Sequence, residues 1–149
     1  MKLYLMRHGQ AASPDIDPQR GLTAEGRVEI QQLAQRLAEK GITFEQVLHS
    51  DKARAQQSAE IMAAVLAPGV TPQMRRGLKP NDDPADFIPE IDCMDEDTLI
   101  ASHLPFVPAL LAALTGSFDQ TQGMGFAPGT VICLAREDNG WQLEWIESP

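Results

Sequence analysis

Cysteine and aromatic residues are scarce in this sequence of 149 residues, and long apolar runs are missing. The two cysteines, Cys93 and Cys133, form no CxxC pair, which argues against a disulfide framework and a thiolate zinc site. No apolar run approaches the length that crosses a membrane, and the N-terminal run at residues 3–6 is too short for a secretory signal. These features predict a soluble, cytoplasmic protein that does not act at a membrane.

Basic residues are also in short supply, and they are unevenly distributed. The chain has 12 Lys and Arg against 21 Asp and Glu, a net charge of −9, which argues against nucleic acid as a partner. After Lys79 the only base is Arg136, and eight acids lie between Asp82 and Asp97. This acidic segment, residues 82–97, is interpreted either as solvated surface or as a face that repels anions and helps to select a partner.

The remaining composition, 43% hydrophobic and 22% charged, is typical of a globular domain, and we expect one domain over residues 1–149. Apolar patterns predict strands at residues 2–6, 47–48 and 98–101, an edge strand at 72–76, and a hairpin of 130–135 with 141–146. Helices are expected after an N-cap at Thr23 and up to Gly41, and at residues 52–66, 85–91 and 105–114, with an irregular stretch at 116–129. The alternation predicts an α/β fold, a three-layer α/β/α sandwich with a mostly parallel central sheet and a C-terminal antiparallel hairpin.

Polar residues follow three of the expected strands directly. In open α/β sheets, ligands bind outside the carboxyl ends of the strands, so these residues are expected to share one edge of the sheet. In chain order they are Arg7, His8 and Gly9, then His49 and Ser50 with Arg54 one helical turn further on, and finally Ser102 and His103.

Two arginines and two histidines at one edge suit phosphate chemistry. The arginine fork matches phosphate oxygens, and histidine either attacks phosphorus as a neutral imidazole or donates a hydrogen bond. Gly9 would allow close approach of a phosphoryl group, and a helix that begins after His103 would add backbone donors. Taken one by one, the same residues also fit structural roles: a hydrogen-bonded histidine, or an arginine paired with a carboxylate. No HxH, HExxH, P-loop or dinucleotide motif occurs, so neither a metal nor a cofactor is predicted.

Four motifs in order resemble those of the histidine phosphatase (phosphoglycerate mutase-like) superfamily. Met6-Arg7-His8-Gly9 is similar to its RHG signature, and residues 20–26 (RGLTAEG) to the family's entry into the first helix. Residues 47–58 (VLHSDKARAQQS) resemble the segment that carries the second arginine, and 102–105 (SHLP) the motif of the second histidine. The short chain and the SHLP form are most similar to bacterial phosphohistidine phosphatases of the SixA type.

The resemblance implies a phosphatase without a metal, in which His8 is the nucleophile. It further implies that Arg7, Arg54 and a protonated His103 bind the phosphoryl oxygens, with Arg20 near the pocket entrance. The expected reaction has two in-line displacements through a phosphohistidine enzyme.

The sequence departs from larger members of that family in two respects. It has no room for insertions that wall off a small-molecule pocket, and it has no obvious glutamate acid after the third expected strand. Asp82 or Asp83 is the available replacement, with a solvated loop carboxylate as the alternative reading. Because an imidazole leaves more readily than an alkoxide, both departures favour a phosphohistidine on a partner protein as substrate. A phosphorylated small molecule, or a non-catalytic phosphate-binding module, remains the alternative.

Overall fold

A single sheet organises the computed structural model of the chain, which describes residues 1–116 and 126–149. Its strands are β1 (Lys2–Arg7), β2 (Gln46–His49), β3 (Gln73–Met74), β4 (Thr98–Ser102), β5 (Val131–Glu137) and β6 (Gly140–Glu147). They lie in the order β3-β2-β4-β1-β5-β6, and the first four are parallel, whereas β5 and β6 pair antiparallel. The predicted sheet, with its antiparallel hairpin at the C-terminal end, is confirmed.

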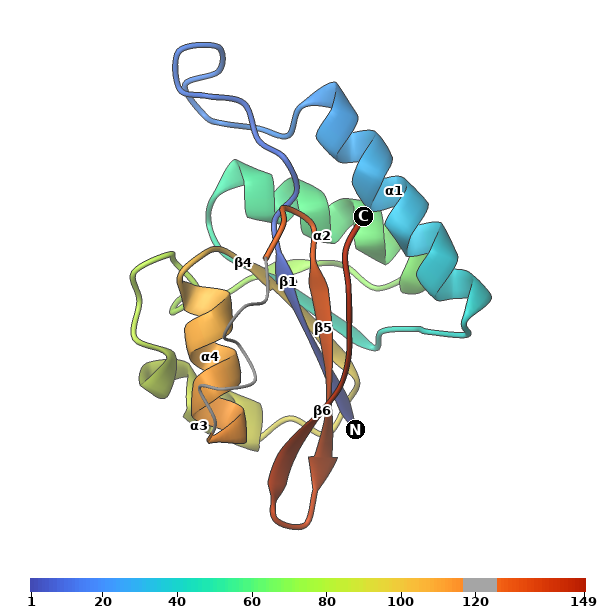
Figure 1. Cartoon of the computed structure of the whole chain (residues 1–149), viewed down its shortest axis with the longest axis vertical. Coiled ribbons are helices and arrows are strands. Elements are labelled where there is room, and N and C mark those ends of the chain that lie inside the picture. Colours follow the sequence, from blue (N-terminus) through green and yellow to red (C-terminus); the bar gives the residue numbers. More distant parts are fainter. Residues whose placement is uncertain (117–125) are drawn as a thin grey trace.

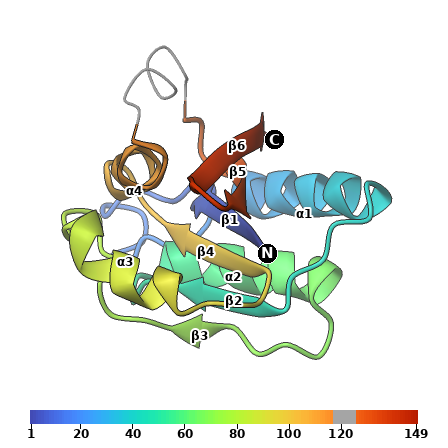
Figure 2. The ribbon, with the colours of Figure 1, turned by 90° about the horizontal axis from the view of Figure 1, so that it is seen from below.

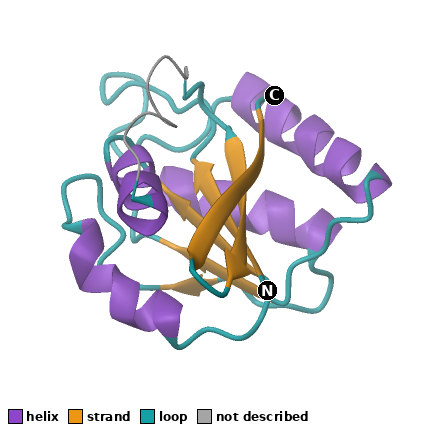
Figure 3. Ribbon diagram, turned by 60° about the horizontal axis from the view of Figure 1, so that its bottom comes forward, coloured by secondary structure: helices purple, strands orange, loops and turns teal. Residues whose placement is uncertain are grey.

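Helices cover both faces of this sheet, as Figures 2 and 3 show. The first face carries α1 (Ala24–Glu39) and α2 (Ala53–Leu66), and the second carries α3 (Pro84–Asp92) and α4 (Phe106–Thr115). The C-terminal end of the chain lies beside α1, where Arg36 Nη2 donates to the Ser148 carbonyl at 2.9 Å (Figure 1). The expected three-layer sandwich is confirmed.

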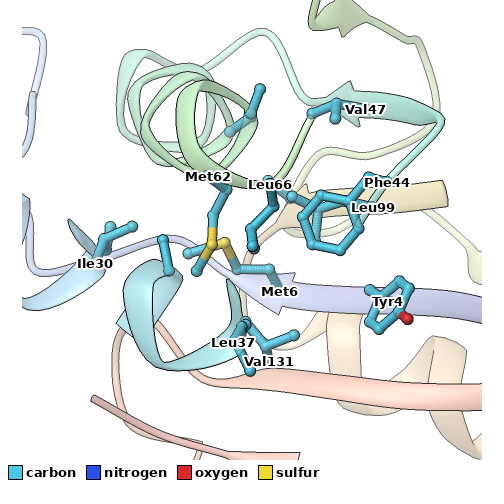
Figure 4. Close-up of a cluster of buried hydrophobic side chains, with 14 of the residues drawn as sticks. Tyr4, Met6, Ile30, Leu37, Phe44, Val47, Met62, Leu66, Leu99 and Val131 are labelled. Atoms are coloured by element: carbon cyan, nitrogen blue, oxygen red, sulfur yellow. The ribbon is translucent and has the colours of Figure 1, made fainter. Parts of the chain in front are cut away.

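The two-residue period of a strand explains why both faces of the sheet are apolar. Along β1, Leu3 and Leu5 point to the α3–α4 side, whereas Tyr4 and Met6 point to the α1–α2 side, and all four are buried. Figure 4 shows Met6 among the α1 and α2 side chains that cover it. Each such large side chain contributes about 1.5–3 kcal/mol on burial, so the core fixes the positions of the strand ends.

Helix ends largely follow the expected signals. Thr23 Oγ1 accepts from Gly26 N at 2.9 Å and caps α1, and Gly41 follows its end with a φ of +78°. The edge strand is shorter than the expected 72–76, with two residues in β3.

Part of the irregular stretch expected at 116–129, residues 117–125, lies outside the described residues. Among the helices that the structure describes, none is both long and apolar enough to span a bilayer.

Candidate active site

The carboxyl ends of β2, β4 and β1 lie side by side, because these three neighbouring strands are parallel. Arg7 is in register with Ser102, and the His8 N–H continues the pairing by donating to the Ser102 carbonyl at 2.9 Å. The rings of His8 and His103 therefore meet, with centroids 5.1 Å apart and planes at 60°. Two of the predicted site residues, distant in sequence, thus share this edge.

His8 is held in one orientation and in its neutral form. Its Nδ1 lies 2.7 Å from the Gly9 carbonyl oxygen, which can only accept, so Nδ1 carries the proton and Nε2 of the neutral ring is bare. Burial lowers the pKa of His8 to about 4, against the opposing hydrogen bond to Gly9, and the charges of Arg54 and Arg7 lower it further. At neutral pH the ring therefore offers an unprotonated Nε2, as a nucleophile requires.

Three buried nitrogens around this imidazole have no hydrogen-bond partner among the described residues. They are Arg7 Nε, Arg54 Nε and His103 Nδ1. Buried donors are otherwise satisfied in folded proteins because an unpaired one costs free energy. The charges of Arg7 and Arg54 both lower the pKa of His8, and the charge of Arg54 also lowers the pKa of His103. Unpaired nitrogens of two cationic side chains near these imidazoles are suited to an anion.

Both arginines stay cationic although burial lowers the pKa of each. Arg7 is oriented by a hydrogen bond from Nη1 to the Phe126 carbonyl. Arg54 is the second residue of α2, and its carbonyl accepts from Ser58 Oγ at 2.7 Å. A backbone contact thus anchors the Arg7 guanidinium, whereas at Arg54 the bond from Ser58 holds the backbone from which the side chain extends.

The surroundings of His103 favour its neutral form in the free protein, and the protonated form expected with phosphoryl oxygens bound stays a prediction. His103 is only 1% exposed, and burial, followed by the charges of His8 and Arg54, lowers its pKa to about 3. The ring is therefore neutral at neutral pH in the free protein, since its surroundings disfavour a further positive charge. Its Nε2 lies 2.6 Å from Ser50 Oγ. The helix start behind it is less available than expected, because the Val107 N–H donates to the His103 carbonyl.

Arg20 belongs to the segment that precedes α1, and its predicted place at the entrance of the site stays a prediction. Its charge lowers the pKa of both His8 and Arg54, and its Nε donates to the Ala12 carbonyl at 3.1 Å. Its backbone is left-handed, with φ of +53°, and Asp17 supports that turn by accepting from the N–H groups of Arg20 and Gly21. Arg20 therefore remains a candidate for contacts with substrate.

Packing against α1 explains why residue 9 is a glycine. A Cβ on Gly9 would lie 2.3 Å from Ile30 Cδ1 and 3.3 Å from Leu22 Cδ2. The Gly9 N–H donates to Ser58 Oγ at 2.9 Å. Because Ser58 also bonds the Arg54 carbonyl, it connects the segment of His8 and Gly9 to the start of α2. The close approach of a phosphoryl group to Gly9 stays a prediction.

The third histidine, His49, is a structural residue by its contacts. It is 4% exposed, and its Nδ1 donates to the Ser50 carbonyl at 2.7 Å. No group of three or more His, Cys, Asp or Glu side chains in the described ranges is arranged to hold a metal ion.

The two carboxylates considered as general acids both have local backbone contacts. Asp83 caps α3 by accepting from Ala85 N at 2.9 Å, and Asp82 Oδ2 accepts from Lys79 N at 2.9 Å. Asp82 also lines a cleft of about 340 Å³ with Asp51, which directly follows Ser50, and with Lys79 and residues 74–77. Of the two, Asp82 lines this cleft, whose lining includes none of the predicted catalytic residues.

Sequence reasoning did not assign roles to Ser50 and Ser58. Both hydroxyls are buried and bond to site segments, Ser50 to His103 and Ser58 to Gly9. Their occurrence within the motif at residues 47–58 is the signal that pointed to them, but the partners become visible only in the fold.

Comparisons with known proteins agree with a phosphate-binding site on this fold. The sequence matches the histidine phosphatase superfamily (branch 1) over residues 3–80. An uncharacterized protein of Picosynechococcus sp. is 37% identical, over 100% of this chain and 97% of its own. The protein histidine phosphatase SixA, solved with tungstate, superposes with a TM-score of 0.85 at 26% identity, over 99% of this chain and 97% of SixA. Phosphoserine phosphatase of Entamoeba histolytica, solved with phosphoserine, has a TM-score of 0.75 at 13% identity, over 97% and 95%.

The fold and the cationic edge define the chain as a phosphatase-type α/β protein. It belongs to the histidine phosphatase superfamily, whose members are phosphatases. The predicted resemblance is thereby confirmed, and the structural likeness extends to SixA.

Proposed function

We propose that this protein is a metal-independent phosphohistidine phosphatase that acts on a partner protein through a covalent phospho-His8 intermediate. The observation that carries the proposal is the set of three buried, unpartnered nitrogens, Arg7 Nε, Arg54 Nε and His103 Nδ1, around a neutral His8. A phosphoryl group has oxygens for such donors and a phosphorus atom for Nε2. The structural likeness to SixA, a protein histidine phosphatase, supports the same substrate class.

In the first step, His8 Nε2 attacks phosphorus in line with the N–P bond of the substrate. That bond breaks as the new one forms, and the departing imidazole takes a proton from solvent. Nδ1 keeps its proton and its bond to the Gly9 carbonyl, which stabilises the charge that develops on the ring. Arg7 and Arg54 bind the equatorial oxygens, where each correctly placed donor is worth about 3 kcal/mol by analogy with oxyanion holes.

In the second step, water attacks the phosphorus of phospho-His8 from the side that the substrate imidazole has left. The N–P bond breaks, inorganic phosphate leaves, and His8 returns to its neutral form. The two guanidinium groups neutralise charge on the oxygens throughout, a role that a divalent cation performs in other phosphoryl transfer sites.

The contacts of the carboxylates support phosphohistidine over a phosphomonoester. An alkoxide needs a proton from a positioned acid as it leaves, whereas an imidazole makes weaker demands. Asp83 is engaged at the start of α3, and Asp82 is bonded to the Lys79 N–H.

The proposal is tested with ³²P-labelled phosphohistidine carrier proteins, with sugar phosphates and p-nitrophenyl phosphate as competing substrates and with EDTA present. We expect rapid release of phosphate from the carriers only, and one acid-labile phosphoryl group on the enzyme after rapid quenching. Preferred turnover of the esters would identify a phosphomonoesterase. Phosphate binding without a covalent adduct would identify a binding module, and loss of activity in EDTA would contradict metal independence.

A further inference from the structure

The hydroxyl of Ser50 lies between the His103 ring and the backbone of Lys52. Ser50 is 0% exposed, and its Oγ lies 2.6 Å from His103 Nε2 and 3.3 Å from the Lys52 backbone nitrogen. The backbone N–H of Ser50 donates to the Ala101 carbonyl at 3.3 Å. This places a hydroxyl on the side of the His103 ring away from the unpartnered Nδ1.

The protons around Ser50 Oγ can be assigned by elimination. The Lys52 N–H can only donate, so Oγ accepts there. If Nε2 also donated to Oγ, the hydroxyl proton would have no acceptor among the described residues, and Nδ1 would be a buried acceptor with no donor within hydrogen-bond distance. If Oγ donates to Nε2, every proton has a partner except the one on Nδ1, which then faces the anion site. The second arrangement leaves the fewest buried groups unsatisfied.

We propose that Ser50 is a positioning residue that holds neutral His103 in the Nδ1–H tautomer, so that the ring donates to a bound phosphoryl group without needing a second proton. Its role at the phosphoryl group rests on the function proposed above. The tautomer itself does not.

The consequence concerns charge. Arg7 and Arg54 already bring two positive charges to the site, and the surroundings of His103 also include His8, Lys52 and Asp51. A third cation in this buried space would be costly without the anion, whereas a neutral N–H donor is available before the substrate arrives. Ser50 therefore keeps the His103 Nδ1–H available as a hydrogen-bond donor in the free protein.

The first test reads the tautomer directly, in the wild-type protein, from the ¹⁵N shifts and long-range ¹H–¹⁵N couplings of the His103 ring at neutral pH. We expect a protonated, pyrrole-type Nδ1 and an unprotonated, pyridine-type Nε2. A protonated Nε2, or a doubly protonated ring, would overturn the proposal. This measurement needs neither a variant nor turnover, so it is decided separately from the phosphatase activity.

The second test measures binding of sulfate, a dianion at every pH used, by NMR titration of wild type, Ser50→Ala and Ser50→Thr. At about pH 8 we expect Ser50→Ala to bind sulfate about tenfold more weakly, since neutral His103 is then free to place its proton on Nε2. The deficit should shrink toward about pH 5, because binding of the anion favours protonation of His103, which supplies an Nδ1–H in either protein. Ser50→Thr, which keeps the hydroxyl, should restore binding.

Ser102→Ala is the matched control, because Ser102 is equally buried and its hydroxyl donates to the Leu78 carbonyl at 2.6 Å rather than to His103. We expect it to lose stability without a pH-dependent change in sulfate affinity. A deficit in Ser50→Ala that is equal at both pH values, or that Ser102→Ala shares, would show that Ser50 acts through packing alone and would overturn the proposal.

Discussion

The end of β1 and the end of β2 carry histidines with the same local structure and different chemistry. His8 and His49 each stand at the carboxyl end of a central parallel strand, each is buried, and each donates from Nδ1 to the carbonyl of the next residue at 2.7 Å. His8 has Arg54 and His103 beside it, brought from the start of α2 and the end of β4. The local bond fixes a tautomer at both places, and in the proposed function the cationic and imidazole groups from distant segments make His8 the reactive one.

The residue that follows each histidine shows the same contrast. After His8 comes Gly9, which has no room for a Cβ against Ile30, and which brings the chain close to α1. After His49 comes Ser50, whose side chain is directed to His103. The end of β2 thus contributes to the site through the contact of Ser50 with His103, whereas the end of β1 contributes His8 itself.

The largest expected difference comes from replacing each histidine by asparagine. The amide nitrogen of asparagine takes the place of Nδ1, so the bond to the next carbonyl is kept while the nitrogen at Nε2 is removed. His8→Asn should lose phosphoenzyme formation and about 10⁴-fold or more in turnover, as expected when a nucleophile is removed. Quenched-flow labelling with a phosphohistidine carrier measures both.

His49→Asn is the control for that experiment. Since His49 is buried among structural contacts, we expect a lower free energy of unfolding, by about 1–3 kcal/mol, with labelling retained. A labelled His8→Asn protein would show that another residue accepts the phosphoryl group. A folded His49→Asn protein without label would show that His49 is also needed for phosphoryl transfer and is not a purely structural residue.

Much of this comparison was predictable because parallel strands end at one edge. The apolar runs at residues 2–6, 47–48 and 98–101 identified β1, β2 and β4, and the residues directly after them include His8 and His103, which the structure brings together. Thr23 and Gly41 likewise predicted the ends of α1, because both residue types are favoured at helix caps. Apolar runs and capping residues depend only on neighbouring positions in the chain, so they can be recognised from the sequence alone.

Other features depend on contacts that no local pattern encodes. The neutral state of His103 follows from burial beside His8 and Arg54, and the bond to Ser50 requires β2 and β4 to be adjacent. The reason for glycine at position 9 lies in the α1 side chain Ile30. The cap role of Asp83 depends on where α3 begins. That start is hard to predict from the sequence, because Pro84 and Pro89 both lie within the helix.

A second prediction sharpens the contrast at the residue after each histidine. Gly9→Ala should destabilise the protein by about 1–3 kcal/mol, because the new methyl meets Ile30 Cδ1, which sits in a closed core. Ile30→Val removes that atom, so the alanine should cost less in the Ile30→Val background. Urea unfolding of the four proteins in this cycle measures the coupling. Equal costs of Gly9→Ala in both backgrounds would show that contact with Ile30 Cδ1 is not the cause of the destabilisation.

The smallest effect expected is on the pH dependence of stability. Burial holds the pKa of His8 at about 4 and that of His103 at about 3, below the ordinary value of about 6.5. As pH falls below about 6.5, the unfolded chain takes up protons at these positions while the native state does not, so the free energy of unfolding falls. Above about pH 6.5 neither state protonates them, and their contribution is constant. Urea midpoints from about pH 7 to about pH 5, where most carboxylates stay ionised, should therefore decline for wild type. The decline should be shallower in the double variant His8→Asn with His103→Gln, which lacks both titrating rings, and equal slopes in the two proteins would show that burial does not hold these histidines neutral.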